Sequence, residues 1–200
     1  MLKLYHAPAT RSARIVWLLE ELGDVPCEVI TPDFVMPDQH IHTQNTPTGK
    51  YPTLTDGDLT IFESAAIIDH IIMKHADGCM MPPPGSDDAA RCRQWMGFAE
   101  GGLATPLNLL AWYKYFDQDQ PGKEHTIARM AGWASDSLNA LAADFGSGPW
   151  LLGADISAAD IMIGYTLYMA KGTGCELPAP LDGYFQQVEA RPGFQKGMGR

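Results

Sequence analysis

Three consecutive prolines divide this chain into two parts of different character. They lie at 82–84, inside the stretch GCMMPPPGSDD at residues 78–88. Because proline lacks a backbone N–H and has a fixed φ, such a run cannot continue a helix or a strand ladder. Strand and helix patterns alternate before it, and helix patterns alone follow it. We therefore predict an α/β domain at 1–77, a linker at 78–87 and an all-helical domain at 88–200.

The chain begins with a strand–helix–strand pattern. Residues 2–5 and 27–31 alternate between apolar and polar side chains, as short strands do. Between them, apolar residues recur at helical spacing from Arg11 onward, until Gly23 supplies a stop signal. This order and these lengths predict a parallel βαβ unit.

A hairpin and a helix follow an irregular polar stretch. Residues 52–55 and 59–62 flank Asp56-Gly57-Asp58, and Asp-Gly between two alternating runs is a strong signal for an antiparallel hairpin. A helix pattern opens at Glu63-Ser64. The order βαβ, loop, ββα, with helices alone beyond the linker, predicts an α+β protein.

The second half contains four helical patterns. Pro106 lies inside the first of them and is expected to kink it. The four patterns cover residues 88–116, 123–145, 157–171 and 181–190.

The charge of the chain argues against two classes of partner. Fourteen basic and twenty-four acidic residues give a net charge of −10. Nucleic acids and anionic membranes are bound through a basic surface, so neither is expected as a partner. A small anionic ligand needs only a few local cations and remains compatible with this composition.

The sequence shows no sign of export or of a metal centre. The first residues lack the apolar core of a signal peptide, and apolar runs such as Ile71–Met73 are far too short to span a membrane. We therefore expect a cytoplasmic protein. No C-x-x-C pair is present, so we expect neither a dithiol redox site nor a metal site. The cysteines are Cys27, Cys79, Cys92 and Cys175.

Two segments around the hairpin are suited to holding a peptide. Pro52 after Tyr51 is either the first residue of an edge strand or part of a cis peptide bond. A cis bond would turn the Tyr51 N–H and C=O outward, so that an extended peptide could pair with them. Glu63 and Ser64 can cap the following helix. They can also bind an α-amino acid group, because free N–H groups at a helix start bind carboxylates and the Glu63 carboxylate attracts an ammonium group.

The segment after the first strand brings hydroxyl groups to the start of a helix. Thr10 or Ser12 can serve simply as the N-cap residue. A thiol placed beside either hydroxyl would ionise more readily, since the helix end and a hydrogen bond both favour the thiolate.

Together these motifs resemble those of the cytosolic glutathione transferases over essentially the whole chain. Four stretches resemble, in order, the first strand with its catalytic loop and helix, the cis-proline hairpin with its Glu-Ser motif, helix four, and the C-terminal capping segment. The last would contain an N-cap box formed by Ser157 and Asp160. The stretches are LYHAPATRSARIVWLLEELG, TPTGKYPTLTDGDLTIFESAAIIDHI, QWMGFAEG and LLGADISAADIMIG.

The resemblance implies a thioredoxin-like first domain that binds glutathione, a helical second domain with the pocket for the other substrate, and a homodimer. Glu63 and Ser64 would hold the γ-glutamyl group, and the Tyr51 backbone before Pro52 would pair with the cysteinyl unit. The residues implied for the glycine carboxylate are Lys50 and either Gln39 or His40.

The family position of the catalytic serine is best matched by Thr10. The resemblance therefore implies that the Thr10 hydroxyl, helped by the backbone N–H groups of Arg11 and Ser12, stabilises the glutathione thiolate. Ser12 remains the alternative. A related bacterial class has cysteine at the Arg11 position, so no mixed disulfide with glutathione is expected here.

Three functions are compatible with this resemblance. The first is a glutathione transferase acting on a hydrophobic electrophile or a peroxide, with a pocket lined by Trp112, Tyr113 and Phe116. The second is a glutathione-dependent disulfide reductase that uses no protein cysteine. The third is a non-catalytic interaction protein that keeps the fold. The presence of Pro52 and Glu63-Ser64 favours retained glutathione binding.

Overall fold

The computed structural model describes residues 1–31 and 46–199. The chain forms two compact units, one of Met1–Pro83 with Glu189–Arg200 and one of Pro84–Val188. The sequence placed all of 88–200 in the helical domain, whereas the structure assigns the C-terminal segment to the first unit.

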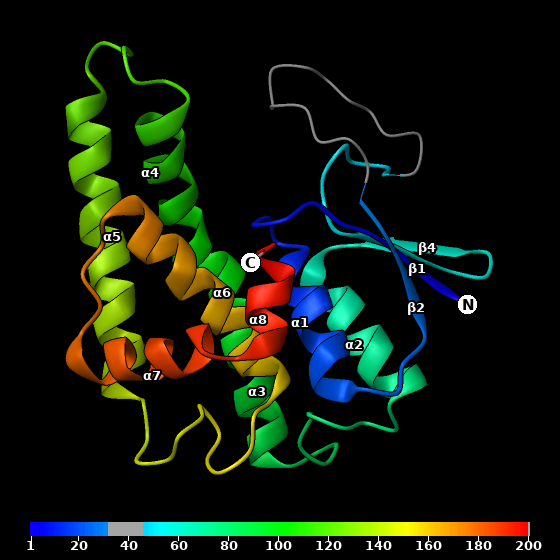
Figure 1. The fold of residues 1–200 in the computed structure, drawn as a ribbon. Coiled ribbons are helices and arrows are strands. Elements are labelled where there is room, and N and C mark those ends of the chain that lie inside the picture. The colour runs from blue at the N-terminus through cyan, green and yellow to red at the C-terminus, as the bar shows by residue number, and fades with distance from the viewer. Residues whose placement is uncertain (32–45, 200) are drawn as a thin grey trace. The chain divides into compact units, whose positions relative to one another are not determined.

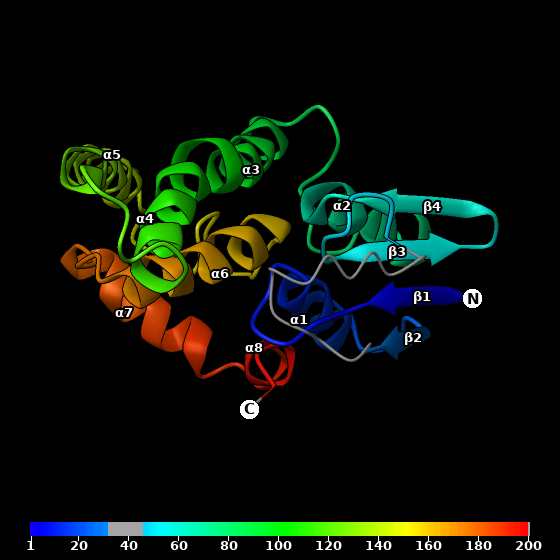
Figure 2. The same cartoon turned by 90° about the horizontal axis from the view of Figure 1, so that it is seen from above.

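The first unit is built on a four-stranded sheet in the order β2-β1-β3-β4, which can be followed in Figure 2. β1 pairs in parallel with β2 and antiparallel with β3, and β3 pairs antiparallel with β4. This arrangement confirms the predicted βαβ and ββα units. The strands are β1 (Leu2–Tyr5), β2 (Cys27–Ile30), β3 (Thr53–Asp56) and β4 (Leu59–Phe62).

The described residues of this unit form three helices, which are α1 (Ala13–Leu22), α2 (Ser64–His75) and α8 (Pro192–Gly197). α1 packs against both α2 and α8, as Figure 1 shows. Most apolar positions that predicted α1, α2 and the central strands are buried, among them Leu4, Ile15 and Ile68. On the outer strands β2 and β4, Val29, Leu59 and Phe62 are 40–44% exposed. The sheet and its helices therefore share one apolar core.

The short helix α8 explains why the C-terminal segment joins the first unit. The Phe194 ring meets the Trp17 ring edge-on at 5.4 Å between centroids. Arg191 forms an ion pair with Glu21, and the Arg191 Nε donates to Glu21 Oε1 at 2.8 Å. Gly197 lies so close to α1 that an added Cβ would stand 2.5 Å from the Ala13 carbonyl oxygen. Apolar contact, an ion pair and a close backbone approach thus fix α8 on α1.

The second unit is helical. The long helix predicted at 88–116 is divided by a π-helical stretch, η1, which ends just before Pro106, in the first turn of α4. The predicted capping box of Ser157 and Asp160 is present at the start of α6. No helix in the described part of the chain is long and apolar enough to cross a membrane. The elements are α3 (Asp87–Phe98), η1 (Ala99–Ala104), α4 (Thr105–Tyr115), α5 (Lys123–Ala143), α6 (Ala158–Thr173) and α7 (Ala179–Glu189).

Candidate functional site

One edge of the sheet gathers the three segments that the sequence singled out. The strand register places Tyr5 opposite Thr53, and Thr53 opposite Phe62. The chain leaves β1 after Tyr5, enters β3 at Thr53 and leaves β4 after Phe62. The loop after β1, the segment before β3 and the start of α2 therefore meet at the same edge of the first unit.

Ser12 is fully buried, and its hydroxyl is surrounded by partners from its own loop. Its Oγ lies 2.7 Å from His6 Nδ1 and 2.7 Å from Thr10 Oγ1. It also accepts from the Ala7 N–H at 3.1 Å and lies 3.1 Å from the Ala7 carbonyl oxygen. Ser12 occupies the N-cap position of α1, but its side chain makes no cap hydrogen bond with the described residues. The expected capping role is therefore not seen, and Ser12 instead organises the loop.

Thr10 is the more accessible of the two hydroxyl residues. It is partly exposed, and its Oγ1 donates to the Ala7 carbonyl at 2.7 Å. The Ser12 N–H donates to the same Oγ1 at 3.3 Å. Arg11, between the two, is also partly exposed. A molecule bound at this edge could contact Thr10, whereas Ser12 lies behind it.

His6 lies at the buried end of a chain of hydrogen bonds that runs through the Ser12 hydroxyl to the Thr10 hydroxyl, called the hydroxyl chain below. Only 5% of the residue is exposed, and burial lowers the pKa of His6 below its ordinary value of 6.5. Since burial disfavours the charged form of an imidazole, His6 is neutral near pH 7. A neutral imidazole has one N–H and one acceptor nitrogen, so His6 can hold the Ser12 hydroxyl in one orientation.

The start of α2 is connected to the start of α1 by a buried arginine. The Arg14 Nη1 donates to Ser64 Oγ at 2.9 Å, and both residues are buried. Ser64 is the first residue of α2, and Glu63 holds the N-cap position with a φ of 72°. The sequence offered Ser64 as a cap, whereas the structure gives that position to Glu63, whose side chain is exposed. Arg14 thus joins two of the three predicted segments.

The third segment precedes β3. The Tyr51–Pro52 peptide bond is cis, as predicted. Lys50 is exposed and Tyr51 is half-buried. Gln39 and His40, the other residues expected to bind the peptide carboxylate, lie outside the described residues.

The predicted pocket residues lie on and after α4, in the helical unit. Trp112 is 50% exposed and Phe116 48% exposed, and their rings are 5.5 Å apart between centroids. Tyr113 is half-buried. The exposure of Trp112 argues against a role of this side chain in the core of this unit.

A hollow of about 330 Å³ occurs elsewhere in the helical unit. It is lined mainly by the connection between α5 and α6, and it contains the Arg91–Asp144 ion pair at 2.5 Å. None of the three predicted pocket residues lines it. No pattern in the sequence predicted this hollow.

The four cysteines, all within the described residues, are free thiols. Cys92 is fully buried, and burial raises the pKa of the Cys27 thiol to about 11. A thiol with such a pKa is protonated near neutral pH and is a weak nucleophile. None of the four lies in the loop that carries Thr10 and Ser12.

Sequence analysis missed two residues of this edge, His6 and Arg14. Arg14 carried a signal that could have been used, because it is a charged residue directly before the apolar run Ile15–Leu19 and so lies on the buried part of its helix. His6 carried no comparable signal, since a histidine after a strand is equally common on a surface.

Comparisons with known proteins show what this chain is similar to. Residues 1–72 match the family model for the glutathione S-transferase N-terminal domain. The chain is 29% identical over 202 residues to the glutathione S-transferase-like protein tpcF of Aspergillus fumigatus, covering 92% of this chain and 89% of that relative.

Two further similarities extend the comparison. The structure of human glutathione S-transferase T1-1 in its apo form superposes with a TM-score of 0.82 at 26% identity, covering all of this chain and 88% of that one. Elongation factor 1-gamma of Prunus avium is 31% identical over 165 residues, which are 76% of this chain but only 37% of that relative. The relatives thus include an elongation factor as well as glutathione S-transferase proteins. Similarity alone therefore does not establish an activity for this chain.

Proposed function

Because the chain belongs to the glutathione S-transferase family, we propose that it binds glutathione and activates the thiol of this peptide as a thiolate. The thiolate attacks a hydrophobic electrophile or a peroxide, whose own reactivity completes the reaction. The observation that carries this proposal is the chain of hydrogen bonds from buried His6 through Ser12 to partly exposed Thr10. This chain ends at the edge where the family binds its peptide.

Each oxygen in the hydroxyl chain has a definite role in this proposal. A hydroxyl group has one proton to donate and two lone pairs that accept. In the Nδ1–H tautomer, neutral His6 donates to Ser12 Oγ, which also accepts from the Ala7 N–H at 3.1 Å. Ser12 then has one proton to donate, either to Thr10 Oγ1 at 2.7 Å or to the Ala7 carbonyl oxygen at 3.1 Å, and in the proposed mechanism it donates along the shorter contact, to Thr10. The Thr10 proton then turns from the Ala7 carbonyl to the bound thiolate.

The expected effect on the thiol is large enough to matter. A cysteine thiol ordinarily has a pKa of about 8.5, so only a few per cent is thiolate near pH 7. A hydrogen bond to a charged acceptor contributes about 1.5–3 kcal/mol. This corresponds to a fall of about one to two units in the thiol pKa. Thr10 alone could therefore bring the thiol close to half ionised at neutral pH.

The rest of the edge provides groups for the ends of the peptide. The exposed Glu63 carboxylate binds the γ-glutamyl ammonium, and the first N–H groups of α2 bind its carboxylate. Buried Arg14, 2.9 Å from Ser64 Oγ, adds positive charge beneath that carboxylate. Lys50 neutralises the glycine carboxylate, and the Tyr51 backbone pairs with the cysteinyl unit.

Other parts of the proposal depend more heavily on the family. Gln39 or His40 assists Lys50, and the exposed Trp112 and Phe116, with Tyr113, offer an apolar face to the second substrate. The chain forms a homodimer in the cytoplasm. Trp95 and Met96, in the apolar stretch at residues 95–99, are buried within the chain and therefore do not offer a surface to this dimer.

A glutathione-dependent disulfide reductase is the second candidate. The site would supply the same thiolate, which would attack a mixed disulfide instead of a carbon or peroxide centre. The raised pKa of Cys27 and the burial of Cys92 favour a reaction without a protein cysteine. A non-catalytic role is the third candidate, and the hydroxyl chain, which such a role does not need, argues against it.

The test measures conjugation of glutathione with an activated aryl halide between pH 6 and 9, together with glutathione affinity by calorimetry. Thr10→Ala should slow conjugation near neutral pH by about 10- to 1,000-fold, as the loss of one donor to a developing anion does. The loss should shrink as pH rises and the thiol ionises unaided. Thr10→Ser should keep most of the activity. Glutathione affinity should change little, because Thr10 contacts only the thiol.

Matched variants separate the two halves of the proposal. Thr60→Ala removes an exposed threonine hydroxyl from β4 and should leave the rate unchanged. Glu63→Gln should weaken glutathione binding about tenfold or more, whereas Asp69→Asn, at an exposed acid on α2, should not. If Ser12→Ala abolishes the rate while Thr10→Ala has no effect, the thiolate contact belongs to Ser12. If neither variant matters, the side-chain mechanism is wrong.

A further inference from the structure

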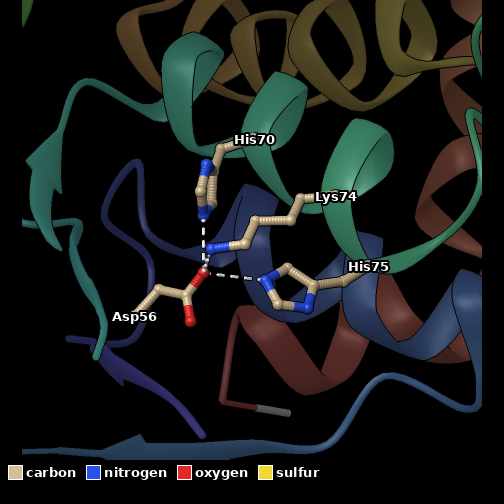
Figure 3. A network of polar contacts seen from close by, with 4 residues as sticks. All are labelled: Asp56, His70, Lys74 and His75. Atoms are coloured by element: carbon tan, nitrogen blue, oxygen red, sulfur yellow. Dashed lines mark hydrogen bonds and ion pairs between the residues drawn. The ribbon is translucent and has the colours of Figure 1, made fainter. Parts of the chain in front are cut away.

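A cluster of two histidines and an aspartate lies in the first unit, and the function above does not use it. Figure 3 shows His70, Lys74 and His75 of α2 turned toward Asp56, the last residue of β3. We propose that Asp56, His70 and His75 form a binding site for one divalent transition-metal ion of the zinc type. This proposal is independent of glutathione binding, and it departs from the expectation of no metal site that the cysteine spacing led to.

The three ligand atoms already converge on one point. Both His70 Nε2 and His75 Nε2 lie 2.9 Å from the same carboxylate oxygen, Asp56 Oδ2. The candidate ligand atoms all lie within 4.8 Å of one another. Ligands about 2.0 Å from a tetrahedral zinc ion are about 3.3 Å apart. The nitrogen–oxygen distances therefore need to open by about 0.4 Å, and the two nitrogens need to close by at most about 1.5 Å.

The scaffold allows these small shifts without a change of fold. His70 and His75 come from one helix, and Asp56 comes from the strand end that directly precedes the hairpin turn at Gly57. The two imidazole rings are 5.7 Å apart between centroids and inclined at 64°. They are thus not stacked, and rotation about their side-chain bonds can bring both nitrogens to an ion. The helix and the hairpin hold the Cα atoms in place.

The chemistry of the donors selects the class of ion. Two imidazole nitrogens and one carboxylate oxygen suit zinc, cobalt, nickel or copper, whereas magnesium and calcium prefer oxygen ligands alone. The side chains are 11%, 18% and 27% exposed for Asp56, His70 and His75. An ion can therefore enter from solvent, and water can complete its coordination.

Lys74 is the group that an ion must replace. Its ammonium nitrogen lies 2.7 Å from Asp56 Oδ2, and its side chain is 55% exposed. A long exposed lysine can swing into water at little cost, and the incoming ion restores the positive charge beside the carboxylate. The hydrogen bonds from Lys74, His75 and His70 hold the pKa of Asp56 far below its ordinary value. The carboxylate is thus ionised near neutral pH.

The position of the cluster, away from the edge proposed for glutathione, favours an ion that stabilises the fold rather than one that takes part in the reaction. Asp56 lies at the opposite end of β3 from Thr53, which belongs to the edge proposed for glutathione. A bound ion would tie the hairpin to the C-terminal turn of α2. It should therefore stabilise the first unit without entering the reaction.

The test uses the full chain, freed of metals with a chelator and kept without glutathione, which itself binds zinc. Calorimetric titration with Zn²⁺ should show one site with micromolar or tighter affinity, and the unfolding temperature should rise by several degrees. His70→Ala and His75→Ala should each weaken binding at least tenfold. Lys74→Ala should strengthen it several-fold, because the competing ammonium is gone. His125→Ala, at an exposed histidine on α5, should change nothing.

Cobalt distinguishes this site from the cysteines. Co²⁺ bound to imidazole and carboxylate should give visible absorption without the intense near-ultraviolet bands of cobalt–thiolate bonds. Three results would overturn the proposal: no ion bound at 100 µM, thiolate bands in the cobalt spectrum, or equal binding by wild type and both histidine variants. Lys74→Ala keeps all three ligands, so its failure to raise affinity would also count against the site.

Discussion

Replacing Asp160 with alanine should be among the most damaging single changes in the helical unit. Asp160 is fully buried at the start of α6 and accepts four hydrogen bonds. Its Oδ2 accepts from the Ser157 N–H at 2.8 Å and from the Ser157 hydroxyl at 2.6 Å. Its Oδ1 accepts from the Leu151 N–H and from the Tyr184 hydroxyl, both at 2.9 Å. One side chain thus connects the start of α6, the preceding turn and α7.

The expected loss of stability follows from the buried hydrogen-bond donors that Asp160→Ala would leave without this acceptor. The two hydroxyl groups can rotate toward other acceptors, but the backbone N–H groups of Leu151 and Ser157 would remain buried without this carboxylate. A buried donor without a partner costs about 1–3 kcal/mol, and the lost cap adds about 1 kcal/mol. We expect a loss of about 3–5 kcal/mol, out of the roughly 5–15 kcal/mol typical of a folded protein. For a chain of this size that is a fall of about 10 °C in unfolding temperature.

Two matched variants make the assay decisive. Asp155→Ala removes an exposed carboxylate five residues earlier and should shift the unfolding temperature by less than about 2 °C. Tyr184→Phe removes one of the four donors and should cost about 0.5–1.5 kcal/mol. Thermal unfolding by circular dichroism should therefore rank Asp160→Ala, Tyr184→Phe and Asp155→Ala in that order of damage. If Asp160→Ala behaved like Asp155→Ala, the reasoning from buried donors would be refuted.

Two further predictions concern the first unit. Gly197→Ala should lower the free energy of unfolding by about 1–3 kcal/mol, because the added Cβ would stand 2.5 Å from the Ala13 carbonyl oxygen. Gly183→Ala is the control, because no atom outside its own helix backbone and chain neighbours lies within 4 Å of the added Cβ. In urea unfolding this control should be neutral or slightly stabilising. Burial lowers the pKa of His6 in the folded protein below its ordinary value of 6.5. The stability that the neutral ring contributes should therefore be fully present above pH 6.5, and it should be lost as the pH falls through the lower pKa of the folded state. His6→Gln should make unfolding less dependent on pH below 6.5, and an unchanged slope would contradict a buried neutral His6.

Elements with local signals could be predicted from the sequence. The hairpin at Asp56-Gly57-Asp58 and the capping box at Ser157 depend on residues only a few positions apart, and both are present. Pro106 predicted a kink in the first long helix, and the structure has a π-helical stretch that ends just before this residue. The π-helical form could not be predicted, because it depends on how the flanking helices α3 and α4 pack.

The short helix α8 could not be predicted from neighbouring residues in the sequence. Arg191-Pro192-Gly193 looks like a place where a helix stops, and six residues are too few to form a stable helix alone. The helix exists because Phe194 meets Trp17 and because Gly193 and Gly197 allow a close approach to α1. The formation of α8 therefore depends on contacts between residues more than 170 positions apart in the sequence, and a short stretch of sequence cannot reveal such contacts.

In the candidate site too, local sequence indicates some features and the fold decides others. The resemblance favoured Thr10 and left Ser12 as the alternative, because both carry a hydroxyl group. What separates them is a third residue, His6, whose buried ring engages Ser12 at 2.7 Å and leaves Thr10 as the partly exposed end of the chain. Threonine and serine can exchange at such an end, provided that the groups behind it still orient the hydroxyl. In the function proposed above, the residue that decides which hydroxyl faces the thiol is therefore His6, a neighbour that itself touches no substrate.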